Sequence, residues 1–177
     1  MTANEKRRMV IDKYKEILGR NRYSKPLRDY CFKPYEDGMF YSDSSSSICY
    51  AYRMSGFDMD IMDTAGMCQS NKLVKVPAVI KNGQIKNLDI LRIGDILVFA
   101  GNDDSRWFCD YAGHVEMIAD IGINMITIYG HGSGTPSAKD MRKYCKSRYS
   151  SKANTPTGNR GLIRVLRFIS DEEENNT

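Results

Sequence analysis

The sequence predicts an α+β fold in which N-terminal helices pack on a central antiparallel β-sheet. Two helical segments occupy the first third of the chain, and short apolar runs bounded by turn residues follow them. This order of helix, loop, helix and sequential strands is typical of folds that segregate helices from an antiparallel sheet. With 177 residues, 41% of them hydrophobic, we expect one domain over residues 1–170 and an acidic, disordered tail over residues 171–177.

The first helix is expected over residues 4–18. Apolar side chains recur there at helical spacing between lysines and arginines, and Gly19 ends the helix. These apolar residues are Met9, Val10, Tyr14, Ile17 and Leu18. An aromatic-rich loop follows, because Pro26, Pro34 and Gly38 interrupt any regular element.

A second helix is expected to start in a polar run. Asp43 precedes four serines and then an apolar, helix-compatible segment that ends near Gly56. Asp and Ser are preferred N-caps, because their oxygens accept the unpaired N–H groups of the first turn, so Ser44 or a neighbour should open this helix. Taken alone, the run favours a solvated turn, but the rest of the chain favours the helix. The residues expected to face the core are Ile48, Ala51 and Tyr52.

The rest of the chain is expected to form mainly strands. Asn82-Gly83 is a strong type I′ turn signal. Residues 58–68 are ambiguous and could hold a short helix, and residues 138–148 favour another. The expected strands are residues 73–80, 94–99, 113–118, 125–129 and 161–169.

Composition excludes several classes of function. The net charge of +4 is a mild basic excess, and without a clustered basic stripe we expect no nucleic-acid partner. No apolar run approaches the roughly 20 residues of a membrane span, so stable membrane insertion is not expected. The charged residues 1–8 are not followed by an apolar segment, which predicts no secretory signal. Nothing in the sequence fixes the oligomeric state.

The cysteines give no sign of a metal or redox motif. They are five in number, widely spaced and without a CxxC pair: Cys31, Cys49, Cys68, Cys109 and Cys145. We therefore expect reduced, mostly buried thiols, and neither a metal nor an organic cofactor.

The two histidines fall at matching places in the predicted strands. His114 begins one strand, His131 ends the next, and each has a glycine beside it. If these strands pair as an antiparallel hairpin, the two imidazoles share one edge of the sheet. Together with the helix start at Ser44 they supply the parts of a nucleophilic triad, which are a nucleophile, a base and a group that orients the base.

Several segments resemble the NlpC/P60 family of cysteine peptidases, which have a papain-like fold. Asp43-Ser44-Ser45-Ser46 and the following Ile48 and Ala51-Tyr52 are similar to the family's Asp-Cys-Ser-Gly/Ser block. Residues 113–117 resemble its histidine strand, and residues 94–99 resemble the strand before it.

Two further segments extend the resemblance. Residues 130–134 are similar to the segment that bears the third catalytic residue in clostridial and phage members, and residues 19–23 resemble the upstream block with an active-site tyrosine. The blocks follow the family's order over residues 15–170.

The resemblance implies a peptidoglycan hydrolase that cleaves a stem-peptide amide, commonly the bond after γ-D-glutamate. The nucleophile at position 44 would attack the carbonyl, His114 would move the proton, and His131 would orient His114. The N–H of residue 44, with the hydroxyl of Tyr23 or of Tyr35 as a second candidate, would hold the oxyanion. Asp43 and Ser45 would bind the peptide, although helix capping explains Ser45 equally well. Trp107 could wall the cleft, or simply pack.

Position 44 departs from the family, because Ser44 stands where the nucleophilic cysteine is found. Cys49 lies five residues further on and should point to another helix face, which makes it a poor substitute. Ser44 is either a substituted cysteine or a natural serine in an inactive relative or slow serine hydrolase. The intact histidine segments favour the first interpretation, and either way this form should be inactive or very weak.

Two other classes of function remain open. The chain could be a non-catalytic cell-wall-binding or interaction module of the same fold, or a same-fold amidase toxin or acyltransferase. For the hydrolase, action on the cell wall without an export signal fits a phage endolysin released from the cytoplasm. It also fits a module of a secreted or tail-associated protein.

Overall fold

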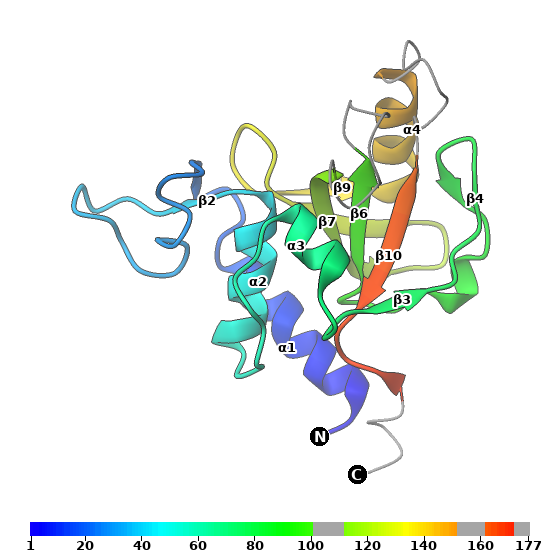
Figure 1. Ribbon diagram of the computed structural model, residues 1–177, viewed down its shortest axis with the longest axis horizontal. Helices are drawn as coiled ribbons and strands as arrows, with labels where there is room; N and C mark the ends of the chain where they lie inside the picture. Colours follow the sequence, from blue (N-terminus) through cyan, green and yellow to red (C-terminus); the bar gives the residue numbers. More distant parts are fainter. Residues whose placement is uncertain (101–111, 152–161, 172–177) are drawn as a thin grey trace.

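A six-stranded antiparallel sheet forms the centre of the molecule (Figure 1). The computed structural model describes residues 1–100, 112–151 and 162–171. In spatial order the strands are β3 (Val74–Val76), β10 (Ile163–Arg167), β6 (Ile96–Ala100), β7 (Ala112–Ile121), β8 (Ile126–Gly130) and β9 (Ser137–Asp140). The predicted α+β class with an antiparallel sheet is therefore confirmed.

Helices cover the two faces of this sheet. The N-terminal helices α1 (Ala3–Lys15) and α2 (Ser44–Met54) pack against each other, and α2 contacts β7 and β8. The helix α4 (Met141–Ser151) contacts β8 and β9, and Figure 1 shows it at the other end of the sheet from α1 and α2. A short helix, α3 (Thr64–Gln69), contacts β7 and fills the region that the sequence left ambiguous.

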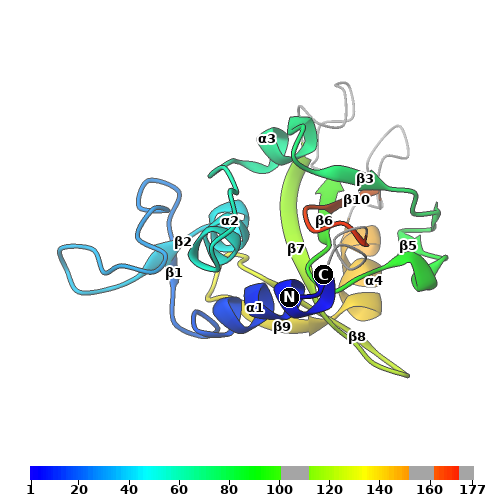
Figure 2. The same ribbon diagram turned by 90° about the horizontal axis from the view of Figure 1, so that it is seen from below.

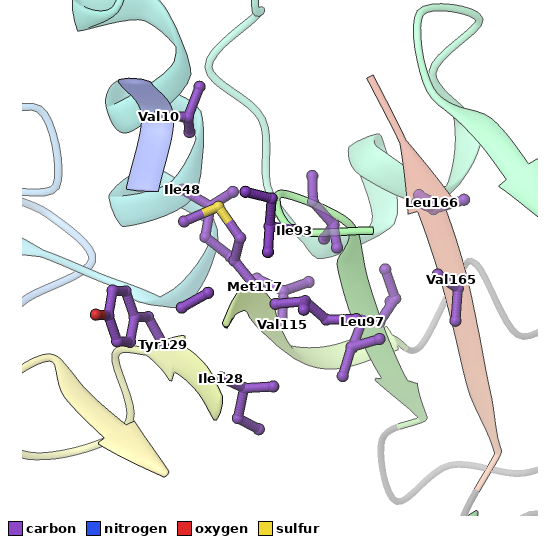
Figure 3. Packing of buried hydrophobic residues seen from close by; sticks show 14 of the residues in the cluster. Val10, Ile48, Ile93, Leu97, Val115, Met117, Ile128, Tyr129, Val165 and Leu166 are labelled. Atoms are coloured by element: carbon purple, nitrogen blue, oxygen red, sulfur yellow. The ribbon is translucent and has the colours of Figure 1, made fainter. Parts of the chain in front are cut away.

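The main core lies between the N-terminal helices and one face of the sheet. Ile48 of α2 lies beside Met117 of β7, and Val10 of α1 and Val115 of β7 belong to the same buried cluster (Figure 3). All four side chains are fully buried. Ala51 and Tyr52 of α2 are buried with Ile48, so the predicted core face of this helix is confirmed. Removing such side chains from water, at about 25 cal/mol per Å² of apolar area, is the dominant force that holds α2 on the sheet.

The predicted first helix is confirmed, although α1 stops at Lys15 and a turn continues to Gly19. Gly19 adopts a φ of +70°, a left-handed conformation that suits glycine at a helix end. Near the start of α1, Arg7 donates to the carbonyl of Ile169 at 2.8 Å and to Asp171 Oδ1 at 2.7 Å. Asp171, which was predicted to begin a disordered tail, is thus anchored, and residues 172–177 lie outside the described part.

Two predicted elements differ from the structure. The strand expected over residues 73–80 is interrupted at Pro77, which cannot donate to a ladder, so residues 74–76 form β3 and Ile80 begins the separate strand β4 (Ile80–Lys81). The helix expected over residues 138–148 begins only at Met141, because residues 138–140 belong to the edge strand β9 and pair with β8.

The turn predicted at Asn82-Gly83 is confirmed. The residues have φ values of +50° and +73°, the double left-handed geometry of a type I′ turn, between β4 (Ile80–Lys81) and β5 (Gln84–Ile85). A Cβ at Gly83 would lie 2.8 Å from the Cβ of Tyr149, so only glycine lets this hairpin lie against α4.

One pairing was not anticipated from the sequence. β1 (Arg22–Tyr23) and β2 (Tyr41–Ser42) form a two-residue parallel ladder in which Tyr23 lies opposite Ser42. This ladder fixes the aromatic loop beside the start of α2. In the part of the chain that the structure describes, no helix combines the length and the apolar character that crossing a membrane requires.

Candidate active site

The start of α2 is a capped and mostly buried polar site. Ser44 is the first residue of the helix, as predicted, and Asp43 is its N-cap. The carboxylate of Asp43 accepts the N–H of Ser46 at 2.9 Å, and the hydroxyl of Ser46 accepts the N–H of Asp43 at 2.9 Å. This reciprocal capping box fixes the helix start. The serines are 7% exposed or less, so the run is not a solvated turn.

The hydroxyl of Ser44 differs from those of Ser45 and Ser47 in its hydrogen-bond partners. The hydroxyl of Ser45 accepts from Arg28 at 2.9 Å, and that of Ser47 donates to the carbonyl of Ser44 at 2.8 Å and accepts from Tyr14 at 3.0 Å. Among the described residues, the Ser44 hydroxyl and the N–H groups of Ser44 and Ser45 have no hydrogen-bond partner. Free donors at the positive end of a helix favour an anionic group.

Arg28, which is not among the site residues that the sequence predicted, holds the loop against this helix start. Its Nη2 donates to Ser45 Oγ and to the carbonyl of Met62 at 2.6 Å, and its Nε lies 3.4 Å from the carboxylate of Asp43. Asp43 and Ser45 therefore have structural partners. A single arginine in an aromatic-rich loop gives no sequence signal for such a role.

His131 is buried in a chain of neutral hydrogen bonds beside the same helix start. Its Nε2 donates to the carbonyl of Gly134 at 2.7 Å, so its Nδ1 accepts from the hydroxyl of Ser42 at 2.8 Å. Ser42 in turn accepts from the side-chain amide of Asn21 at 3.1 Å. Burial lowers the pKa of His131, although the bond to Gly134 opposes the shift, so the ring is neutral at pH 7. The half-exposed ring of Tyr23 meets the imidazole edge-on, 5.4 Å away between centroids.

His114 belongs to a different cluster. Its Nε2 is hydrogen-bonded to Glu116, which is fully buried and also forms an ion pair with Lys139 at 2.8 Å. The ring of Tyr144, on α4, lies 6.0 Å from that of His114 between centroids. A Cβ at Gly130 would overlap the Glu116 carboxylate, so glycine there makes room for this cluster. Glu116, Lys139 and Tyr144 are not among the site residues that the sequence predicted.

The two imidazoles therefore lie on opposite faces of the sheet. β7 and β8 pair antiparallel, as predicted, and Met117 lies opposite Tyr129 on the face that the N-terminal helices cover. Side chains alternate along a strand, so His131 shares the face of Tyr129, and His114 and Glu116 point the other way. His131 was expected to orient His114, but its two ring nitrogens bond to Ser42 and to the carbonyl of Gly134 instead.

The remaining predicted site residues divide as follows. Tyr35 packs on Tyr30 and Tyr41, with centroids 4.8 Å and 6.2 Å apart, which is a packing role in the aromatic loop. Trp107 lies outside the described residues. Burial raises the pKa of Cys49 to about 11, so this thiol is protonated and a poor nucleophile, in line with its predicted unsuitability.

Two other cysteines, Cys31 and Cys145, are also buried. Burial raises the pKa of each thiol to about 12, so both stay protonated and are poor nucleophiles. Within residues 1–100, 112–151 and 162–171, no group of three His, Cys, Asp or Glu side chains could hold a metal ion.

A scan against models of protein families gives no match to this chain, and a search of curated proteins gives none either.

Proposed function

We propose that the chain is a peptidoglycan hydrolase domain with an NlpC/P60-like papain fold that acts on a stem-peptide amide of the cell wall. The observation that carries this proposal is the start of α2. There the Ser44 hydroxyl and two N–H groups are free of partners within the described chain, in the arrangement that a nucleophile and its oxyanion donors require. The proposed substrate follows from the family resemblance.

The same geometry supports weak or absent turnover by the chain as it stands. A serine hydroxyl needs a hydrogen-bonded base, and neither imidazole is bonded to Ser44. A cysteine at this position would differ, because a helix N-terminus lowers the pKa of a thiol and lets the thiolate form. We therefore expect a Ser44→Cys variant to be the active form.

The test is the release of new amino termini from purified peptidoglycan. Ser44→Cys should release them above background, whereas the parent chain should match Ser44→Ala, which lacks any nucleophile. Alkylation of the thiol introduced at position 44 should abolish the release. If Ser44→Cys gives no more amino termini than Ser44→Ala while both remain folded, the hydrolase proposal fails.

A second candidate is a non-catalytic module that binds the wall. The observation that favours it is the engagement of both ring nitrogens of His131 in structural bonds on the α2 face. Cosedimentation with peptidoglycan distinguishes the two candidates. Binding by the parent, Ser44→Cys and Ser44→Ala proteins, with no amino termini released by any of them, would support the binding module.

A further inference from the structure

A cavity of about 400 Å³ lies between α4 and the β4–β5 hairpin, away from the α2 site. Both views show the hairpin alongside α4 (Figures 1 and 2). Its lining combines four basic side chains with a partly apolar remainder: Gln84, Ile85, Lys86, Leu88, Arg142, Lys143 and Lys146.

The charge of this cavity is of one sign. Lys86, Arg142, Lys143 and Lys146 are all exposed, and none of them forms an ion pair with a described residue. No lining residue carries a carboxylate. Lys72, by contrast, pairs with two aspartates, at 3.1 Å and 3.3 Å. The four cations are therefore available to an anion from solvent.

The two walls of the cavity are fixed to each other. The side-chain amide of Gln84 donates to the carbonyl of Arg142 at 3.0 Å, and Gly83 lies against Tyr149. Arg142 and Lys146 are one helical turn apart, about 6 Å along the axis, so they point to the same side of α4. Cations held on a rigid frame lose less conformational entropy when they bind a ligand.

The lining indicates which anion fits. Arginine forks and lysine ammonium groups are the usual protein ligands of phosphate. None of the seven lining residues is aromatic, so the cavity offers no platform on which nucleic-acid bases could stack. We propose that this cavity binds the phosphate groups of an anionic polyol-phosphate polymer of the cell wall. The choice of a wall polymer rests on the proposed function, but phosphate binding itself does not.

The test compares two variants that lose the same charge. Arg142→Gln/Lys146→Gln removes two cations from the cavity, and Arg8→Gln/Lys75→Gln removes two exposed cations from α1 and β3. Each protein is sedimented with cell walls that carry the polyol-phosphate polymer and with the same walls after acid extraction of the polymer. Thermal melts check that the variants are folded.

We expect the parent and the α1/β3 variant to bind intact walls about tenfold more tightly than extracted walls, and less so as salt rises. The cavity variant should bind both kinds of wall alike. Equal binding of the parent to both, or undiminished binding by the cavity variant, would overturn the proposal. So would tighter binding of a single-stranded oligonucleotide at equal phosphate concentration.

The outcome is independent of the hydrolase test. Release of amino termini by Ser44→Cys is measured on extracted walls, where the polymer is absent. Hydrolysis there without polymer binding would contradict only the phosphate site, and polymer binding without hydrolysis would contradict only the hydrolase proposal.

Discussion

The two faces of the central sheet each hold one histidine, and the hydrogen-bond partners of the two rings differ in charge. On the α2 face, His131 is neutral and sits in a chain of uncharged hydrogen bonds with Ser42 and the carbonyl of Gly134. On the α4 face, His114 is bonded to Glu116, which also pairs with Lys139. Both histidines have glycine neighbours and lie at the same end of adjacent strands. Because side chains point alternately to the two faces along a strand, the position of each histidine in its strand determines which face its ring occupies.

This difference matters for any chemistry at Ser44. The imidazole on the face of α2 is His131, linked to the helix start through Ser42, two residues before Ser44. The resemblance instead gave the proton-moving role to His114, whose ring packs with α4. Sequence motifs place both histidines near one edge of the sheet. The face that each ring occupies depends on the alternation of side chains along its strand.

The largest expected effect comes from breaking the charged cluster. Lys139→Met should lower the free energy of unfolding by about 3 kcal/mol, because it leaves the fully buried Glu116 without its lysine and with only the hydrogen bond to His114. Urea denaturation measures the loss.

The matched control removes both charges. Glu116→Gln/Lys139→Met should recover much of the lost stability, because no unpaired charge then stays buried. If Lys139→Met unfolds at the same urea concentration as the parent, Glu116 is not held by an ion pair and the contrast between the faces disappears.

Breaking the neutral chain should cost less. Ser42→Ala removes the donor to His131 Nδ1 and leaves a buried acceptor unsatisfied, which costs about 1–3 kcal/mol. Ser147→Ala, at an exposed position of α4, is the control and should change the stability by about 0.5 kcal/mol or less. A Ser42→Ala protein as stable as Ser147→Ala would mean that water or another group replaces the hydroxyl.

Local sequence signals anticipated much of the fold. The apolar spacing predicted α1, the Asp-Ser run predicted the start of α2, and Asn82-Gly83 predicted the hairpin turn. These features depend on neighbouring residues, through caps, helical periodicity and backbone preference.

The missed features depend on residues far apart in the sequence. Lys139 reaches Glu116 across 23 positions, and Arg28 reaches Met62 across 34. The basic cavity has no counterpart in a clustered basic stripe of the sequence, because only the fold of the hairpin brings Lys86 to α4. The strand β9 was not predicted, because its four residues are half-buried or exposed and show no alternation of apolar and polar side chains.

The smallest expected effect is a dependence of stability on pH that arises on the α2 face. Burial lowers the pKa of His131 in the folded chain, whereas an unfolded histidine titrates near about 6.5. As the pH falls below about 6.5, the unfolded chain takes up a proton that the folded chain resists, so the free energy of unfolding should decrease. Above that pH this contribution is fully present.

The measurement is urea denaturation between pH 7.5 and 5.5, before most carboxylates titrate. His131→Gln keeps a side chain that can donate to Gly134 and accept from Ser42, but it cannot titrate. It should therefore show a shallower loss of stability in acid than the parent. Parallel curves for the two proteins would mean that the His131 ring accepts its proton in the folded state, and the α2 face would then be as tolerant of charge as the α4 face.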